Sequence, residues 1–518
     1  MLSKIFPLKI NSLKKADVFL ILFLIIQPIF DLKIFYNSIS TLIRVVIIFG
    51  LFLFYFVSSK NNKKYYLLIY PLIVFAYFIF HHINAMNFNS LVPGNFNYSI
   101  LKEGLYFTKM LSPFLLIYCL YKSSFSKDMI INIIKILVII ISSTIVLSNL
   151  FVFSYGSYSD IQIKANFFEW FNPSSTYNYY DLASKGLFEF GNQIAAILII
   201  FLPFSIYKIL DNRHWSNWIA LISNVFALIL LCTKVSVLGI FVVFGYSIAS
   251  FIFISFIRKK PFLFKKYIPI CTVLLVSALL LPVNPMFSRI NERNTVIQTF
   301  SETTTEVEEN IVTENFVEET EPELTTPNNV TEEVPSPVVD NNQMMLNYIE
   351  NTYESKKLHK QFLFDNYPYQ YDPEFWYNFL QNDISLTTDY RYIETSMIKR
   401  VVEINNNPAD KFLGITNTRL QNVFNIEKDF VVQYYALGII GLILIFTPYF
   451  MFIICFGYKT IKSKFKNLDT LNLLSIITII FAFGISYITG NLLNSLSFTI
   501  YFSLLFLLLF KNEKIDSL

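Results

Sequence analysis

Cysteine and histidine are both rare in this sequence, which has only four of each among 518 residues. The cysteines lie inside or at the ends of hydrophobic stretches, and they are Cys119, Cys232, Cys271 and Cys455. Neither their positions nor their spacing predicts a disulfide framework or a metal site. The histidines are equally scattered, at His81, His82, His214 and His359. We therefore expect no metal ion, and no motif indicates another cofactor.

Charged residues are also scarce, at 15% of the chain, whereas hydrophobic residues make up 54% and aromatic residues 18%. The mean hydropathy is +0.49, and a soluble domain could not bury the apolar surface that this value implies. The composition therefore indicates an integral membrane protein. A helix that crosses about 30 Å of hydrocarbon needs roughly 20 apolar residues. Twelve stretches meet this condition, near residues 16–33, 37–57, 65–82, 103–121, 129–153, 188–209, 216–232, 235–257, 267–284, 431–457, 469–488 and 491–510. The predicted fold is an all-α polytopic membrane protein with about twelve transmembrane helices.

Lysine and arginine recur after every second predicted span, which predicts the orientation of the chain. Because positive charges in short loops stay in the cytoplasm, we expect both termini to be cytoplasmic and the long loop to be outside. The first stretch has a basic start but no small-residue cleavage site, so we expect it to remain as a span. The net charge of +4 is the sum of basic cytoplasmic turns and an acidic outer loop. It reflects topology, so we expect no nucleic-acid partner.

One long polar segment separates two groups of spans, so we divide the chain into residues 1–284, 285–430 and 431–518. Within the loop, residues 301–340 carry many acidic side chains and no lysine or arginine, which is typical of a disordered insert. Aromatic residues return after Met344, where they would pack on the bilayer or stack on sugars. A membrane protein with one large outer loop is expected to do its chemistry at that face.

Hydrophobic residues recur at helical spacing between Asp383 and Asn407, and a proline at position 408 ends the pattern. Arg391 falls in the first turn of this predicted helix. Free backbone N–H groups at a helix N-terminus and a guanidinium together form a good site for phosphate. The alternative is a surface arginine that pairs with Glu394 or Asp389, and the pattern by itself favours that alternative.

Lys234 lies at the tight outer turn between the seventh and eighth predicted spans, where positive charge runs against the topology rule. It could extend to the membrane surface, or it could hold a phosphate as a point charge, and the sequence favours neither. Arg44 presents the same choice. Because Asp31 lies near the preceding outer turn, we expect a structural ion pair there.

Two carboxylates, Glu427 and Asp429, stand directly before the tenth predicted span. The common role of such residues is to cap the helix that follows. Either could also take a proton from a sugar hydroxyl if burial brought its pKa toward neutrality. Gly438 and Gly441 lie one helical turn apart in that span and allow close helix packing.

Several of these features together resemble the O-antigen ligase and polymerase superfamily. They are the layout of about twelve spans with a large loop before the tenth, Phe188 to Asn192 opening the sixth, the Thr233-Lys234 turn, Arg391 followed by Gly414 after Pro408, and the acidic pair ahead of Gly438 and Gly441. The resemblance covers most of the chain in layout, and its local motifs are short. It implies transfer of a polyprenyl-diphosphate-linked glycan to an acceptor hydroxyl at the outer face of the cytoplasmic membrane, without a metal.

By this resemblance, Arg391 and Lys234 match cations that contact the diphosphate. Lipopolysaccharide ligases carry a histidine eleven residues before the first glycine, where this chain has Glu427. The departure makes a carboxylate, Glu427 or Asp429, the stand-in for the base, and it argues against transfer to lipid A. A composition rich in Phe, Asn, Ile and Lys suggests an AT-rich bacterial genome.

The sequence therefore predicts a metal-independent glycosyltransferase that polymerises lipid-linked oligosaccharide repeat units. Its expected partners are the lipid-linked donor, a glycan acceptor, membrane lipid and other polysaccharide-assembly proteins. One alternative is a ligase that moves a finished glycan to a wall or lipid acceptor. A more distant alternative is a transporter or flippase, which would carry ionisable residues near the middle of its spans.

Overall fold

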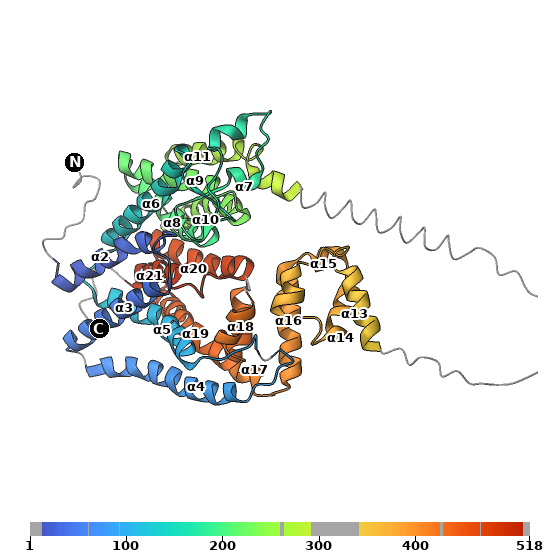
Figure 1. Ribbon diagram of the computed structural model, residues 1–518. Coiled ribbons are helices and arrows are strands. Elements are labelled where there is room, and N and C mark those ends of the chain that lie inside the picture. Colours follow the sequence, from blue (N-terminus) through green and yellow to red (C-terminus); the bar gives the residue numbers. More distant parts are fainter. Residues whose placement is uncertain are drawn as a thin grey trace, which may run out of the picture.

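The computed structural model describes residues 13–60, 62–92, 94–259, 264–291, 341–424, 428–466 and 468–510. Each predicted span falls on one helix within these ranges (Figure 1). The helices are α2 (Lys15–Phe30), α3 (Ser38–Ser58), α4 (Ile69–Met86), α5 (Ile100–Lys122), α6 (Lys127–Leu150), α8 (Gly191–Asp211), α9 (Trp215–Leu230), α10 (Lys234–Ile257), α11 (Ile268–Leu279), α19 (Asp429–Lys462), α20 (Thr470–Thr489) and α21 (Leu496–Phe510). The protein is an all-α polytopic membrane protein.

Among the described residues, eight helices are long and apolar enough to cross a membrane. The number of crossings therefore stays a prediction, as does the division of the chain into three parts. The remaining elements are short: η2 (Asn62–Leu68), η3 (Phe167–Phe171), α7 (Tyr179–Leu182), η4 (Phe264–Lys266), α13 (Asn341–Thr352), the π-helix η5 (Gln361–Asn366), α14 (Pro373–Leu380), α15 (Ile384–Thr387), α16 (Tyr390–Asn405), α17 (Asp410–Leu413), α18 (Asn417–Val423), and the antiparallel strands β1 (Tyr155–Gly156) and β2 (Ser184–Gly186).

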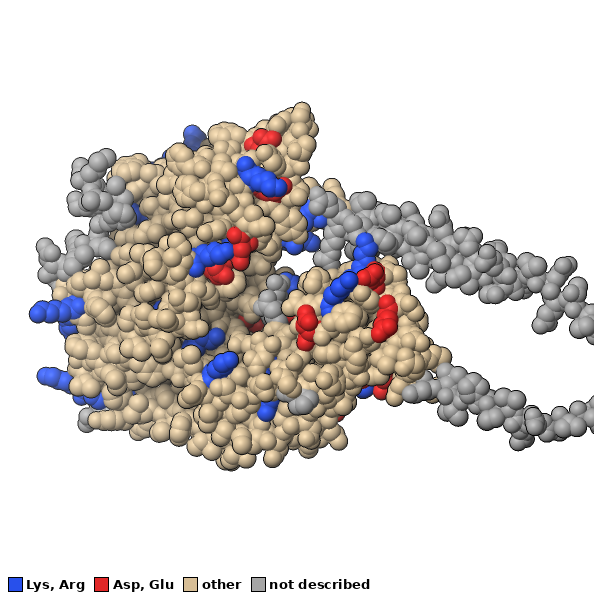
Figure 2. Space-filling model, viewed as in Figure 1, with Lys and Arg blue, Asp and Glu red and all other residues tan. Residues whose placement is uncertain are grey.

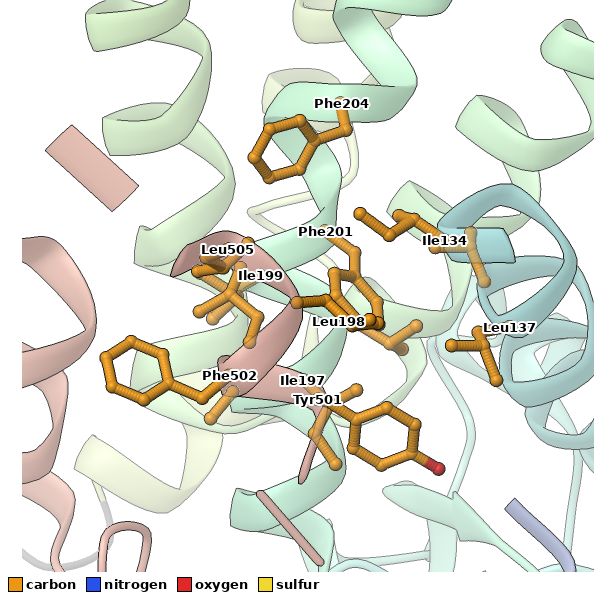
Figure 3. Close-up of a cluster of buried hydrophobic side chains, with 14 of the residues drawn as sticks. Ile134, Leu137, Ile197, Leu198, Ile199, Phe201, Phe204, Tyr501, Phe502 and Leu505 are labelled. Carbon is orange, nitrogen blue, oxygen red and sulfur yellow. The ribbon is translucent and has the colours of Figure 1, made fainter. Parts of the chain in front are cut away.

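Helix α8 forms the centre of the bundle. Its sequence is apolar on every side, as expected for a helix that is surrounded by other helices. Figure 3 shows Phe201 and Phe204 of α8 among side chains of α6, such as Leu137, and of α21, such as Phe502 and Leu505. Van der Waals contact and shape therefore hold most of this part of the bundle together. One buried polar group adds to them, since Asn224 of α9 donates to Leu198 O of α8 at 3.2 Å.

The predicted ion pair of Asp31 and Arg44 is confirmed. The Arg44 guanidinium donates to the Asp31 carboxylate at 2.5 Å, and the two side chains are 1% and 3% exposed. Ser497 and Tyr501 of α21 also donate to Asp31. The pair thus joins α3 and the turn after α2 to α21.

Helices α13 to α16 form a lobe beside the bundle, which we call the lateral lobe (Figure 1). Its longest helix, α16, begins and ends where the sequence predicts. The Asp389 side chain accepts from the N–H of Arg391 at the N-terminus, and Asn406 ends the helix in a left-handed conformation with φ of 47°. The acidic stretch 301–340, which we predicted to be a disordered insert, lies outside the described residues.

Helix α19 is interrupted at Gly438, whose φ is +63°. The carbonyls freed by this break accept from the loop between α17 and α18: Ile415 N–H donates to Tyr435 O, and Thr416 N–H donates to Ala436 O. The two backbones lie so close that neither Gly414 nor Gly438 has room for a side chain. Gly438 therefore allows a contact between two backbones rather than helix packing alone. This contact fixes α17 and α18 against the bundle.

Candidate functional site

A cavity of about 1070 Å³ lies between the bundle and the lateral lobe. Figure 2 shows the surface hollowed between these two parts, with charged side chains nearby. The cavity is lined from the bundle by Tyr158, Tyr180, Asn192, Cys232, Lys234, Val235, Met286, Arg289, Ile290, Ile488 and Thr489, and from the loop by Gln361, Phe362, Asn366, Thr388, Asp389, Tyr390, Arg391, Glu394 and Gln421 to Phe424. A space of this size and mixed polarity suits a large polar ligand.

The structure brings two of the predicted site residues, Lys234 and Arg391, to this one cavity. Lys234 is the exposed first residue of α10, whose N-cap Thr233 forms a capping box with Ser236. Arg391 lies in the first turn of α16, and its Nη1 donates to Ile488 O of α20 at 2.9 Å. Residues far apart in the sequence thus present two cations to the same space.

A third cation, Arg289, lines the same cavity, and sequence reasoning missed it. Its guanidinium lies 4.1 Å from the ring centroid of Tyr158 and 5.0 Å from that of Tyr179. Two aromatic faces hold a guanidinium in one place at little entropic cost. The signal was present, because Arg289 follows the ninth predicted span on the outer side, the same criterion that selected Lys234.

Two carboxylates, Asp389 and Glu394, line the cavity beside these cations. Asp389 caps α16 through the N–H of Arg391. Glu394 lies one helical turn after Arg391 and is 6% exposed. The sequence indicated Glu394 only as an ion-pair partner for Arg391, since no local pattern shows that Glu394 faces a cavity.

The two carboxylates that the sequence singled out have different positions. Asp429 is 0% exposed and is absent from the cavity lining. Its carboxylate accepts from the backbone N–H groups of Leu492 at 2.8 Å, Leu493 at 3.0 Å and Asn494 at 3.3 Å. It therefore binds the turn before α21 and not the helix that it begins, which corrects the capping role that we expected. Glu427 lies outside the described residues.

Amide side chains and aromatic rings cover another part of the cavity wall. The amides are Gln361, Asn366, Gln421 and Asn422. Tyr390 packs edge-on against Phe362 with ring centroids 5.1 Å apart. Amides hydrogen bond to hydroxyl groups and aromatic faces stack on apolar ring surfaces, so the wall has the chemistry to hold a sugar.

Helix α18 is positioned by a buried network that the sequence did not reveal. The Glu103 carboxylate of α5 accepts from Asn417 N–H at 3.0 Å and from Thr418 N–H at 2.8 Å at the start of α18. His81 of α4 lies 3.1 Å from Glu103 and 2.6 Å from Leu413 O. Both imidazole nitrogens thus face acceptors. The network fixes the N-terminus of α18, whose other end lines the cavity.

Among the residues that the structure describes, no three His, Cys, Asp or Glu side chains gather in an arrangement that could hold a metal ion. A family model described as O-antigen ligase like membrane protein matches residues 13–515. The chain belongs to this family. Membership supports a role in the processing of lipid-linked glycans by a multi-pass membrane protein with glycosyltransferase-like activity. No curated protein and no solved structure matches the chain.

Proposed function

We propose that the protein polymerises polyprenyl-diphosphate-linked oligosaccharide repeat units at the outer face of the bacterial cytoplasmic membrane. One observation carries the proposal: Lys234, Arg289 and Arg391 line one cavity, together with amide and aromatic side chains. The diphosphate is already a good leaving group. Cations that stabilise its growing negative charge and a base for the attacking hydroxyl are therefore the main requirements.

In this reaction a hydroxyl oxygen of the acceptor attacks the anomeric carbon of the donor. The bond between that carbon and the diphosphate oxygen breaks, and its electron pair leaves with the lipid diphosphate. Lys234, Arg289 and Arg391 would bind the leaving group more tightly as its charge grows, which lowers the barrier. The acceptor proton passes to a carboxylate. The sequence predicts Glu427 or Asp429 for this role.

The position of Asp429 makes one of these bases the weaker choice. Its carboxylate already accepts three backbone N–H groups, and it is fully buried. Asp429 also does not line the cavity, so an acceptor hydroxyl bound there would not reach its carboxylate. An asparagine has only one carbonyl oxygen, and its NH₂ group cannot accept from the N–H groups that the second carboxylate oxygen binds. We therefore expect Asp429→Asn to destabilise the protein.

The proposed function is tested by inactivating the protein in its host and extracting the lipid-linked glycans for size analysis. If the protein is a polymerase, single repeat units should accumulate. Long lipid-linked chains with a bare final acceptor would instead identify a ligase, the second candidate. An unchanged glycan pool contradicts both and favours a transporter.

A further inference from the structure

We infer that Glu394 is the general base that takes the proton from the acceptor hydroxyl. The inference rests on the proposed glycosyl transfer and names the residue that completes it. Glu394 is a carboxylate in the cavity lining and is 94% buried, since its exposed fraction is 6%. It comes from the same helix that supplies Arg391, and this gives the two residues a fixed spacing.

The helix geometry sets the two groups at a useful separation. Residues three apart on an α-helix lie on the same face, with Cβ atoms about 5–6 Å from each other. The base and the cation that binds the leaving group must both lie near one anomeric carbon, because the acceptor oxygen bonds to the same carbon that the diphosphate leaves. Arg391 and Glu394 lie on one face of α16, and both line the cavity.

Among the described residues, four other charged groups line the cavity with Glu394, namely Lys234 from α10, Arg289, and Asp389 and Arg391 from the start of α16. Asp389 is less suited to the role, because its carboxylate caps α16.

The step balances with these groups alone. The acceptor O–H bond breaks and its proton goes to the Glu394 carboxylate, while the acceptor oxygen bonds to the anomeric carbon. The electron pair of the broken carbon–oxygen bond leaves with the lipid diphosphate. Removal of a general base usually lowers turnover by about 10²–10⁴-fold.

The experiment uses the full-length protein in lipid nanodiscs and, as substrate, the lipid-linked oligosaccharide fraction extracted from cells that lack the protein. The rate of chain growth is measured against pH for wild type, Glu394→Gln, Glu394→Asp and Glu403→Gln. Glu403 is the matched control, because it lies on α16 but lines a separate groove on the lateral lobe with Lys399 and Arg400. Size-exclusion profiles and melting temperatures report folding.

We expect Glu394→Gln to lower kcat about 100-fold or more with KM for the donor within about threefold, and to remove the fall in rate at low pH. Glu394→Asp should retain part of kcat and the low-pH fall, and Glu403→Gln should match wild type. If Glu394→Gln does not fold, a Glu394→Asp variant with wild-type kcat and pH profile overturns the inference.

Three other results also overturn it. A kcat of the Glu394→Gln variant within about threefold of the wild-type value would show that Glu394 is not the base. A raised donor KM with unchanged kcat assigns Glu394 to the positioning of Arg391. Loss of the low-pH fall in Glu427→Gln, but not in Glu394→Gln, assigns the base to Glu427. A wild-type protein that does not extend the extracted glycan at all contradicts the proposed function itself.

Discussion

In the bundle the buried Arg44 is paired with one carboxylate, Asp31, whereas the described residues that line the cavity include three cations and two carboxylates. Within the bundle a buried charge that lacks both a counter-ion and hydrogen bonds would cost several kcal/mol, because no water can solvate it. In the cavity an anionic ligand could neutralise the excess of positive charge. A surplus of one charge beside an open space therefore points to binding, and a matched pair points to structure.

The largest effect should come from breaking the matched pair. We expect Arg44→Ala to lower the free energy of unfolding by about 3–5 kcal/mol, because it leaves the Asp31 carboxylate buried without its cation. Thermal unfolding in detergent measures the loss. The double variant Asp31→Asn with Arg44→Met should recover most of the stability. A loss below about 1 kcal/mol in the single variant would show that the ion pair adds little to the stability of the bundle.

The next effect should come from the cavity and should appear in activity rather than stability. We expect Arg391→Ala to lower kcat about 100-fold, as for loss of one donor to a developing oxyanion, with little change in melting temperature. Lys399→Ala on the same helix is the control, because Lys399 lines the separate groove of the lateral lobe. Normal polymer length and amount from Arg391→Ala, at normal protein levels, would remove Arg391 from the mechanism.

A smaller effect should come from the cation that is held by aromatic rings. We expect Arg289→Ala to lower kcat/KM about tenfold, and Arg289→Lys to recover only part of it, since an ammonium does not stack on both tyrosines as a guanidinium does. Tyr158→Leu should lower activity without removing the charge. Equal activity of Arg289→Ala and wild type would show that Arg289 only packs against the tyrosines.

The smallest effect should come from a surface ion pair. Lys33 lies 3.0 Å from Asp160, which is 66% exposed. The hydrogen bond from Lys33 lowers the pKa of Asp160, so this pairing is present above the ordinary pKa of an aspartate and weakens as the pH falls through the lowered value. We expect Asp160→Asn to change the free energy of unfolding by less than about 1 kcal/mol at neutral pH. A change in the free energy of unfolding as large as that of Arg44→Ala would show that solvent exposure does not distinguish a weak ion pair from a strong one.

Local patterns in the sequence were enough for several features. The bounds of α16 followed from hydrophobic spacing, an Asp cap and a terminating Asn-Pro, all of which act within a few residues. The pair of Asp31 and Arg44 followed from a charge that has to be matched between neighbouring spans. The twelve helices followed from the length of the apolar stretches.

Residues that meet across long chain separations needed the structure. Glu103 binds the start of α18 more than 300 residues later, and Asp429 binds the turn before α21 rather than its own helix. Glu394 gained its significance only from the cavity that it lines. Asp429 was a candidate base from the sequence because no local pattern shows that three N–H groups occupy its carboxylate.

The length and polarity of each stretch are enough to identify a membrane protein of many helices, because they decide whether the stretch can lie in a bilayer. The sequence also marks Lys234 and Arg391 as unusual charges. It takes the folded structure to show that these two residues and Arg289 share one cavity, that Glu394 lines it and that Asp429 does not. The physical reason is that side chains meet according to helix packing and the path of the loops, which no single stretch of sequence specifies.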